Sequence, residues 1–194
     1  MTKPFRGVAV LSALLLVSSV GSHSALIRAQ EAAPPQSAAS VVKTKVYTSL
    51  DPVPRGKEFQ VAVVVDIASG YHMNSHKPLD SYLIPTTLTP QLPAGFTLAD
   101  TVYPAGKNLK FPFSPDKPLN VYTGSVTLRL RVTAEEAAAF GNTSIPITLR
   151  YQACNNSACL PPVKVPVNAE IKVAAADAKA KALHPEIFSA STAK

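Results

Sequence analysis

Hydrophobic and polar side chains alternate with a period of two along several stretches of the chain. The clearest alternation covers residues 59–67, 126–132, 145–151 and 163–167, and weaker strand patterns cover residues 41–50, 84–90 and 96–103. A period of two places the apolar side chains on one face of a strand and the polar ones on the other. This pattern is typical of antiparallel strands that bury one face.

About seven short strands, separated by turns rich in Pro and Gly, therefore follow one another over about 130 residues. We expect an all-β fold, an immunoglobulin-like antiparallel β-sandwich. One helical turn is predicted over residues 133–140, because Thr133 can cap it, Glu136 follows three residues later and Gly141 can end it.

The N-terminal 29 residues have the pattern of a secretory signal peptide. Lys3 and Arg6 precede an apolar run of about 14 residues, which is shorter than the ~20 residues that a spanning helix needs. An uncleaved N-terminal anchor is the alternative. We expect signal cleavage, no stable membrane insertion afterwards, and a periplasmic location. The predicted organisation is a signal peptide at 1–29, a flexible leader at 30–40, a sandwich domain at 41–173 and a tail at 174–194.

Composition narrows the range of functions. The 194 residues carry 19 Lys+Arg against 12 Asp+Glu, a net charge of +7. Loss of Lys3, Arg6 and Arg28 with the signal peptide reduces that net charge from +7 to +4. The remaining basic residues form no block of like charges, so we expect no nucleic-acid partner.

The two cysteines, Cys154 and Cys159, are the main candidate for chemistry. Four residues separate them, and the ends of a hairpin loop of that length lie close enough for a disulfide. Cys154 continues the polar face of its strand, so we expect its sulfur to be accessible. Cys159 has the inward parity of Val163, although Pro161 and Pro162 interrupt that strand. The chemistry expected is thiol–disulfide exchange, which needs no cofactor.

Two other classes of function remain open from the residues alone. The disulfide can be a structural staple in a non-catalytic binding or scaffold sandwich. Alternatively, His72, Met73 and His76 could join the two thiols in a periplasmic copper(I) site, since copper(I) prefers soft ligands. We favour a surface loop that happens to hold these three residues, and expect no metal.

Three motifs are similar to the N-terminal periplasmic domain of the DsbD thiol:disulfide interchange proteins. The motifs are Tyr-Gln-Ala-Cys at 151–154 with Cys-Leu-Pro-Pro at 159–162, Ser-Gly-Tyr-His-Met at 69–73, and Val-Tyr-Thr-Gly-Ser at 121–125. Together they cover roughly residues 45–173. The resemblance implies an immunoglobulin-like sandwich whose cysteine pair shuttles electrons.

The same resemblance implies roles for individual residues. Cys159 forms the mixed disulfides with partners and Cys154 resolves them, while Tyr71 and His72 lie near the pocket. Tyr122 belongs to the segment of a cap loop that shields the pair, with Leu119 or Val121 where the family has a phenylalanine.

The resemblance also implies partners. A thioredoxin-like redox domain would be the electron donor, and a periplasmic disulfide isomerase or oxidoreductase the acceptor. Since the sequence ends before the membrane and thioredoxin-like modules of DsbD, we expect that donor to be another protein in a stand-alone arrangement.

Overall fold

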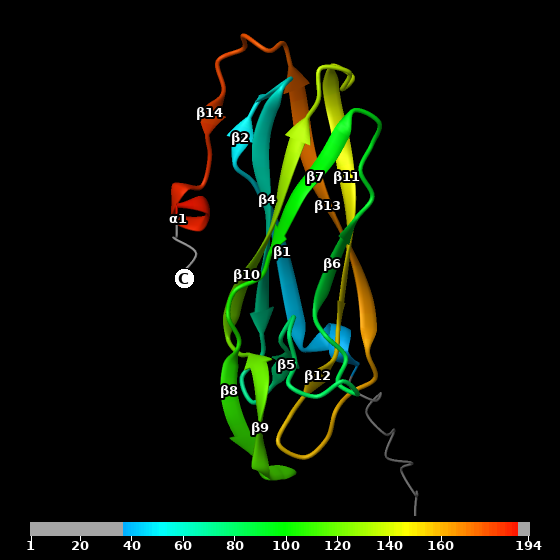
Figure 1. Ribbon diagram of the computed structural model, residues 1–194, viewed down its shortest axis with the longest axis vertical. Helices are drawn as coiled ribbons and strands as arrows, with labels where there is room; N and C mark the ends of the chain where they lie inside the picture. Colours follow the sequence, from blue (N-terminus) through cyan, green and yellow to red (C-terminus); the bar gives the residue numbers. More distant parts are fainter. Residues whose placement is uncertain (1–36, 190–194) are drawn as a thin grey trace, which may run out of the picture. The chain divides into compact units, whose positions relative to one another are not determined.

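The computed structural model describes residues 37–189, and Figure 1 shows how their strands are arranged. The predicted signal peptide at 1–29 and most of the predicted leader lie outside the described residues. Within residues 37–189, no helix is long and apolar enough to cross a membrane. The described part begins with a 3-10 turn, η1 (Ala38–Ser40), and continues as a succession of strands.

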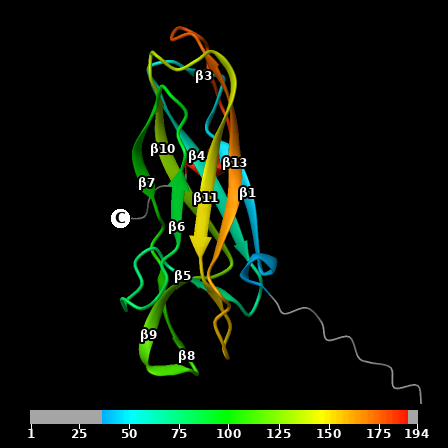
Figure 2. The ribbon, with the colours of Figure 1, turned by 90° about the vertical axis from the view of Figure 1, so that its right-hand side faces the viewer.

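Two four-stranded sheets form the sandwich (Figures 1 and 2). The first has the order β1-β4-β10-β7, with bounds Val42–Thr48, Lys57–Ile67, Ser125–Ala134 and Phe96–Val102. The second has the order β3-β13-β11-β6, with bounds Val53–Pro54, Val163–Ala174, Gly141–Tyr151 and Thr87–Pro90. Every pairing is antiparallel except that of β3 with β13. The predicted immunoglobulin-like sandwich is confirmed.

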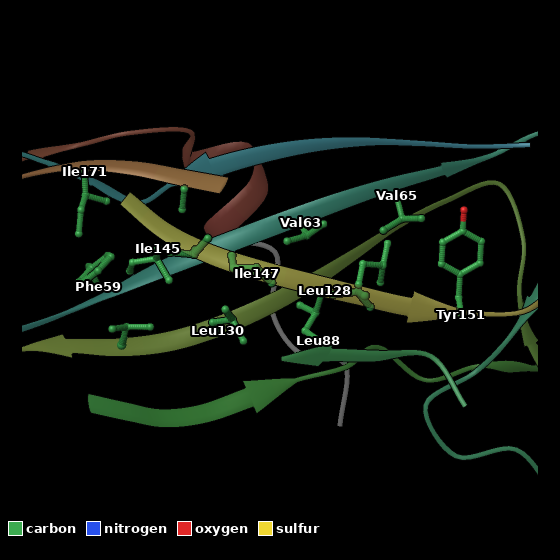
Figure 3. Packing of buried hydrophobic residues seen from close by; sticks show 14 of the residues in the cluster. Phe59, Val63, Val65, Leu88, Leu128, Leu130, Ile145, Ile147, Tyr151 and Ile171 are labelled. Carbon is green, nitrogen blue, oxygen red and sulfur yellow. The ribbon is translucent and has the colours of Figure 1, made fainter. Parts of the chain in front are cut away.

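The core lies between the two sheets, as Figure 3 shows. On β4, Val61, Val63 and Val65 are fully buried, and on β11 Ile145 and Leu149 are too. These residues are the apolar positions of the period-two pattern, so hydrophobic burial explains both strand formation and the pairing of the sheets.

A third sheet lies at one end of the sandwich and carries the cysteine segment (Figure 1). Its order is β12-β5-β9-β8, with bounds Ala153–Cys154, His72–Asn74, Ser114–Tyr122 and Lys107–Phe111. Strands β8 and β9 form a hairpin that the hydrophobic pattern did not predict, because three prolines and several charged residues obscure its alternation.

The C-terminal segment returns to the first sheet. Strand β14 (Lys181–Ala182) pairs with β2 (Leu50–Asp51), and the one-turn helix α1 (Pro185–Phe188) follows it. The Arg129 side chain on β10 donates a hydrogen bond to the carbonyl oxygen of Ile187 at 2.6 Å. These contacts attach the predicted tail to the sandwich.

The helical turn predicted over residues 133–140 is wrong. Strand β10 continues through Thr133 to Ala134, which pairs with Lys57 on one side and Phe96 on the other. A short turn follows, closed by a hydrogen bond from the Ala138 amide to the Glu135 carbonyl at 3.0 Å. Two ladders and the burial of Ala134 override the local capping signal, since tertiary pairing outweighs weak helix propensity.

Candidate functional site

Cys154 and Cys159 are joined by a disulfide in a hairpin at the end of the sandwich. Strand β11 ends at Tyr151, and the chain then leaves the second sheet to form β12. Strand β12 pairs with β5, where Cys154 lies opposite His72. The two cysteines also form an antiparallel bridge with each other, with Cα atoms 3.9 Å apart. The expected hairpin disulfide is therefore present.

Asn155 organises the turn between the cysteines. Its side-chain oxygen accepts hydrogen bonds from the Ser157 amide at 2.8 Å and the Ala158 amide at 2.9 Å. The Asn155 amide in turn donates to the Ala158 carbonyl at 2.9 Å. An asparagine that bonds the backbone two residues ahead is a common way to form a tight turn. These bonds hold the ends of the loop together independently of the sulfur–sulfur bond.

The two sulfur-bearing residues differ in exposure, and the difference is opposite to the expectation from strand parity. Cys154 is only 1% exposed, whereas Cys159 is exposed. The expectation was wrong because it continued the β11 pattern through Gln152, where the strand is interrupted and the chain changes sheets. Pro161 and Pro162 lie outside the ladder, and β13 begins after them. An incoming thiolate therefore reaches Cys159 more readily than Cys154.

Three aromatic rings lie in a stack beside this cysteine pair. The His72 ring stacks on Phe111 with centroids 4.0 Å apart, and Phe111 stacks on Phe113 at 5.5 Å. Phe111 ends β8 and Phe113 occupies the turn of the β8–β9 hairpin. His72 and Phe111 also line a hollow of about 470 Å³ with Tyr71 and Asn156. The hairpin turn is thus held against the strand that pairs with Cys154.

Sequence reasoning missed Phe111 and Phe113. The resemblance directed attention to Leu119 and Val121, which are 3% and 0% exposed on β9 and face the interior. The available signal was the segment Phe-Pro-Phe-Ser-Pro at 111–115, which places two aromatic rings in a turn rich in proline. Phe113 is 44% exposed.

The resemblance assigned Tyr122 to the cap segment, and the structure places it at the base of the hairpin. It is 2% exposed on β9 and lies opposite Met73 on β5. Its hydroxyl donates to the Pro104 carbonyl at 3.0 Å and accepts from the His76 amide at 3.2 Å. Burial raises the pKa of Tyr122, so the hydroxyl remains protonated and keeps both bonds at neutral pH.

His72 is buried and uncharged. It is 2% exposed, and burial lowers the pKa of His72 to about 4 because a charged imidazole loses its hydration there. Tyr71, the preceding residue, is half-buried and lines the hollow with His72. The structure therefore brings His72 and Cys154 together and places Tyr71 beside them.

The candidate copper ligands are not brought together. Met73 is fully buried and belongs to the hydrophobic core, whereas His72, next to it on the strand, lies on the opposite face. The His76 ring stacks on Tyr103 at 3.6 Å, and its Nδ1 lies 3.1 Å from the Thr86 carbonyl. Among residues 37–189, no group of three or more His, Cys, Asp and Glu side chains could hold a metal ion.

The fold and the site define a class of protein: an immunoglobulin-like sandwich that carries a hairpin disulfide with one exposed cysteine at its end. The family model for the N-terminal part of the thiol:disulfide interchange protein DsbD matches residues 38–170. The match covers more than half of the chain, and the chain belongs to this family.

Solved structures give two further comparisons. The reduced N-terminal domain of Neisseria meningitidis DsbD is 20% identical, and the match covers 71% of this chain and 89% of that one, with a TM-score of 0.40. The N-terminal periplasmic domain of ScsB from Proteus mirabilis is 11% identical, covering 66% of this chain and 46% of that one, with a TM-score of 0.44. The comparison with curated proteins gives no match.

Proposed function

We propose that this chain is an exported thiol–disulfide exchange protein that passes electrons between a thioredoxin-like donor and periplasmic disulfide-containing partners. The observation that carries the proposal is the exposed Cys159, bonded to the buried Cys154 in a turn that its own hydrogen bonds organise. Membership of the DsbD N-terminal family supports the same chemistry.

The proposed exchange proceeds through Cys159. A thiolate of the reduced donor attacks the Cys159 sulfur, the bond to Cys154 breaks, and Cys154 leaves as a thiolate that takes up a proton. The donor's second thiol then releases Cys159, so the donor becomes a disulfide and the Cys154/Cys159 pair a dithiol. In the second half, Cys159 attacks the disulfide of an isomerase or oxidoreductase, and Cys154 resolves the mixed disulfide.

The β8–β9 hairpin is the proposed shield of this site. Phe111 and Phe113 take the covering role that the resemblance assigns to a phenylalanine of the cap loop. They precede Leu119 and Val121, the positions at which the resemblance placed that phenylalanine. Tyr122 supports that cover by fixing the hairpin base, and Tyr71 and His72 form the adjoining wall. Docking of a partner would displace the hairpin turn and uncover the pair.

The proposed location is the periplasm, and the proposed organisation follows the sequence. Residues 1–29 direct export, 30–40 form a leader, 41–173 form the exchange domain and 174–194 form a tail. Export places the domain where disulfides form and persist. The proposed partners have thioredoxin-like folds, as the family membership leads us to expect.

The reduction potential of the Cys154/Cys159 pair tests this function. Equilibration with a glutathione or dithiothreitol buffer should give a value between about −270 and −120 mV, the range of exchange proteins. A value below about −300 mV is typical of structural disulfides and would contradict the proposal. The variant with both cysteines changed to Ser is the control: it should fold but accept no electrons from a reduced thioredoxin-like protein. A large loss of stability in this variant would instead indicate a staple.

A further inference from the structure

His72 is the direct cross-strand neighbour of Cys154. The two residues are paired in the antiparallel ladder between β5 and β12, so their side chains lie on the same face. Side chains paired in this way have Cβ atoms about 4.5–5.5 Å apart, close enough for an imidazole to reach a cysteine sulfur. Both residues are buried, with exposures of 2% and 1%.

The imidazole of His72 has an unsatisfied nitrogen. Its Nε2 is buried and has no hydrogen-bond partner among the described residues. Buried polar atoms nearly always have partners, so an exception at a redox site needs an explanation. By contrast, His76 lies four residues away, and its Nδ1 is within hydrogen-bonding distance of a carbonyl.

The oxidised state of the neighbouring cysteine explains the missing partner. A sulfur in a disulfide carries no proton and cannot donate a hydrogen bond, whereas a thiol can. The other residues that line the hollow with His72 carry no formal charge, and Tyr71 alone among them has a titratable side chain. The group beside His72 that gains a donor on reduction is therefore Cys154.

We propose that His72 is a positioning residue for the reduced state: on reduction, the Cys154 thiol donates a hydrogen bond to the His72 Nε2. This inference deepens the proposed function and rests on it for its role in the cell. Reduction by a partner dithiol transfers two electrons and two protons to the pair. One proton resides on Cys154 and is held by His72, the other resides on the exposed Cys159, and the partner becomes a disulfide.

This hydrogen bond has a definite effect on the equilibrium. It exists only in the dithiol, so it favours the reduced form and makes the pair more oxidising. The unpaired nitrogen of the oxidised form acts in the same direction, since it destabilises the disulfide state. In the oxidised state, the stack on Phe111 holds the ring in place beside Cys154.

The test compares the reduction potentials of the wild-type protein and the His72→Phe variant in a small-thiol buffer. Phenylalanine keeps the stack on Phe111 but lacks the nitrogen. The equilibrium should shift three- to tenfold toward the disulfide, a potential more negative by about 15–30 mV for this two-electron couple. The control variant, His76→Phe, should keep the wild-type potential. An unchanged or less negative potential in His72→Phe would overturn the inference.

A measurement on the wild-type protein covers the case in which His72→Phe does not fold. The ¹⁵N chemical shift of the His72 Nε2 should change on reduction by more than any shift of the His76 ring. Equal small changes in both rings would refute the hydrogen bond. Neither measurement uses a protein partner, so failure of electron transfer to a thioredoxin-like protein would count against the proposed function alone.

Discussion

Phe111 stacks on His72 with ring centroids 4.0 Å apart and an angle of 21° between the planes. This contact joins the turn of the β8–β9 hairpin to β5, the strand on which Cys154 pairs. Strand β8 is an edge strand, so its outer side has no neighbour within the described sheets. The ring stack therefore stabilises the position of the hairpin beside the disulfide.

Replacing Phe111 by Ala should expose the disulfide to small thiols. Aromatic pairs contribute about 0.5–1.5 kcal/mol beyond their buried area, which corresponds to about a two- to tenfold larger population of open hairpin. We expect the rate of reduction by dithiothreitol to rise by a similar factor, measured by alkylation of released thiols. Phe140→Ala is the matched control. Phe140 is 60% exposed and directly precedes the start of β11, whereas the cysteine hairpin follows the other end of that strand. Equal rates in both variants and the wild type would contradict the shield.

Single-cysteine variants should trap partners unequally. With Cys154→Ser, the exposed Cys159 can form a mixed disulfide that Cys154 no longer resolves. If the thioredoxin-like partner also has its second cysteine changed to Ser, no thiol of either protein releases the complex, and it should accumulate. With Cys159→Ser, the remaining Cys154 is 1% exposed in the native structure and should trap little. Non-reducing electrophoresis measures both, after mixing with a thioredoxin-like protein that lacks its second cysteine and whose remaining cysteine is activated as a mixed disulfide with a small aromatic thiol, which leaves when Cys159 attacks. Stronger trapping by Cys159→Ser would reverse the assigned roles.

The strands of the sandwich could be predicted from the sequence because each buries one face. The alternation from Phe59 to Ile67 corresponds to β4, and that from Ile145 to Tyr151 to β11, and the burial follows the apolar positions. The cysteine hairpin could also be predicted, since loop length alone brings Cys154 and Cys159 together. These features depend on local periodicity and chain geometry.

The surroundings of the site could not be predicted in the same way because they depend on contacts between distant segments. The burial of Cys154 follows from the transfer of the chain from the sheet of β11 to that of β5. The position of Phe111 follows from the folding of a proline-containing hairpin against His72. Neither the sheet change nor the ring stack produces a periodic signal in the sequence.

Asn155→Ala should destabilise the disulfide relative to the dithiol. The Asn155 side chain accepts two backbone hydrogen bonds that close the turn, so its loss lets the reduced cysteines separate and lowers their effective concentration. Because one hydrogen bond contributes about 0.5–1.5 kcal/mol, we expect at least a two- to tenfold shift toward the dithiol. Ser157→Ala is the control, since the Ser157 amide rather than its side chain makes the bond. A more negative potential in Asn155→Ala would contradict this role of the turn.

The free energy of unfolding of the oxidised protein should decrease as the pH is lowered, and part of this decrease should come from His72. Burial lowers the pKa of His72 to about 4 from 6.5, so between these values the unfolded chain binds a proton that the folded chain does not. The contribution of neutral His72 to stability is therefore complete above pH 6.5 and is lost as the pH falls toward 4. The full loss is on the order of 3 kcal/mol.

Guanidinium unfolding of the oxidised wild-type protein and of His72→Phe, at pH 7 and at pH 4.5, measures this contribution. His72→Phe should lose less stability than the wild type between the two pH values, because phenylalanine does not titrate. Carboxylates titrate in both proteins and cancel in the difference. Identical pH dependence in wild type and His72→Phe would mean that His72 is protonated in the folded protein.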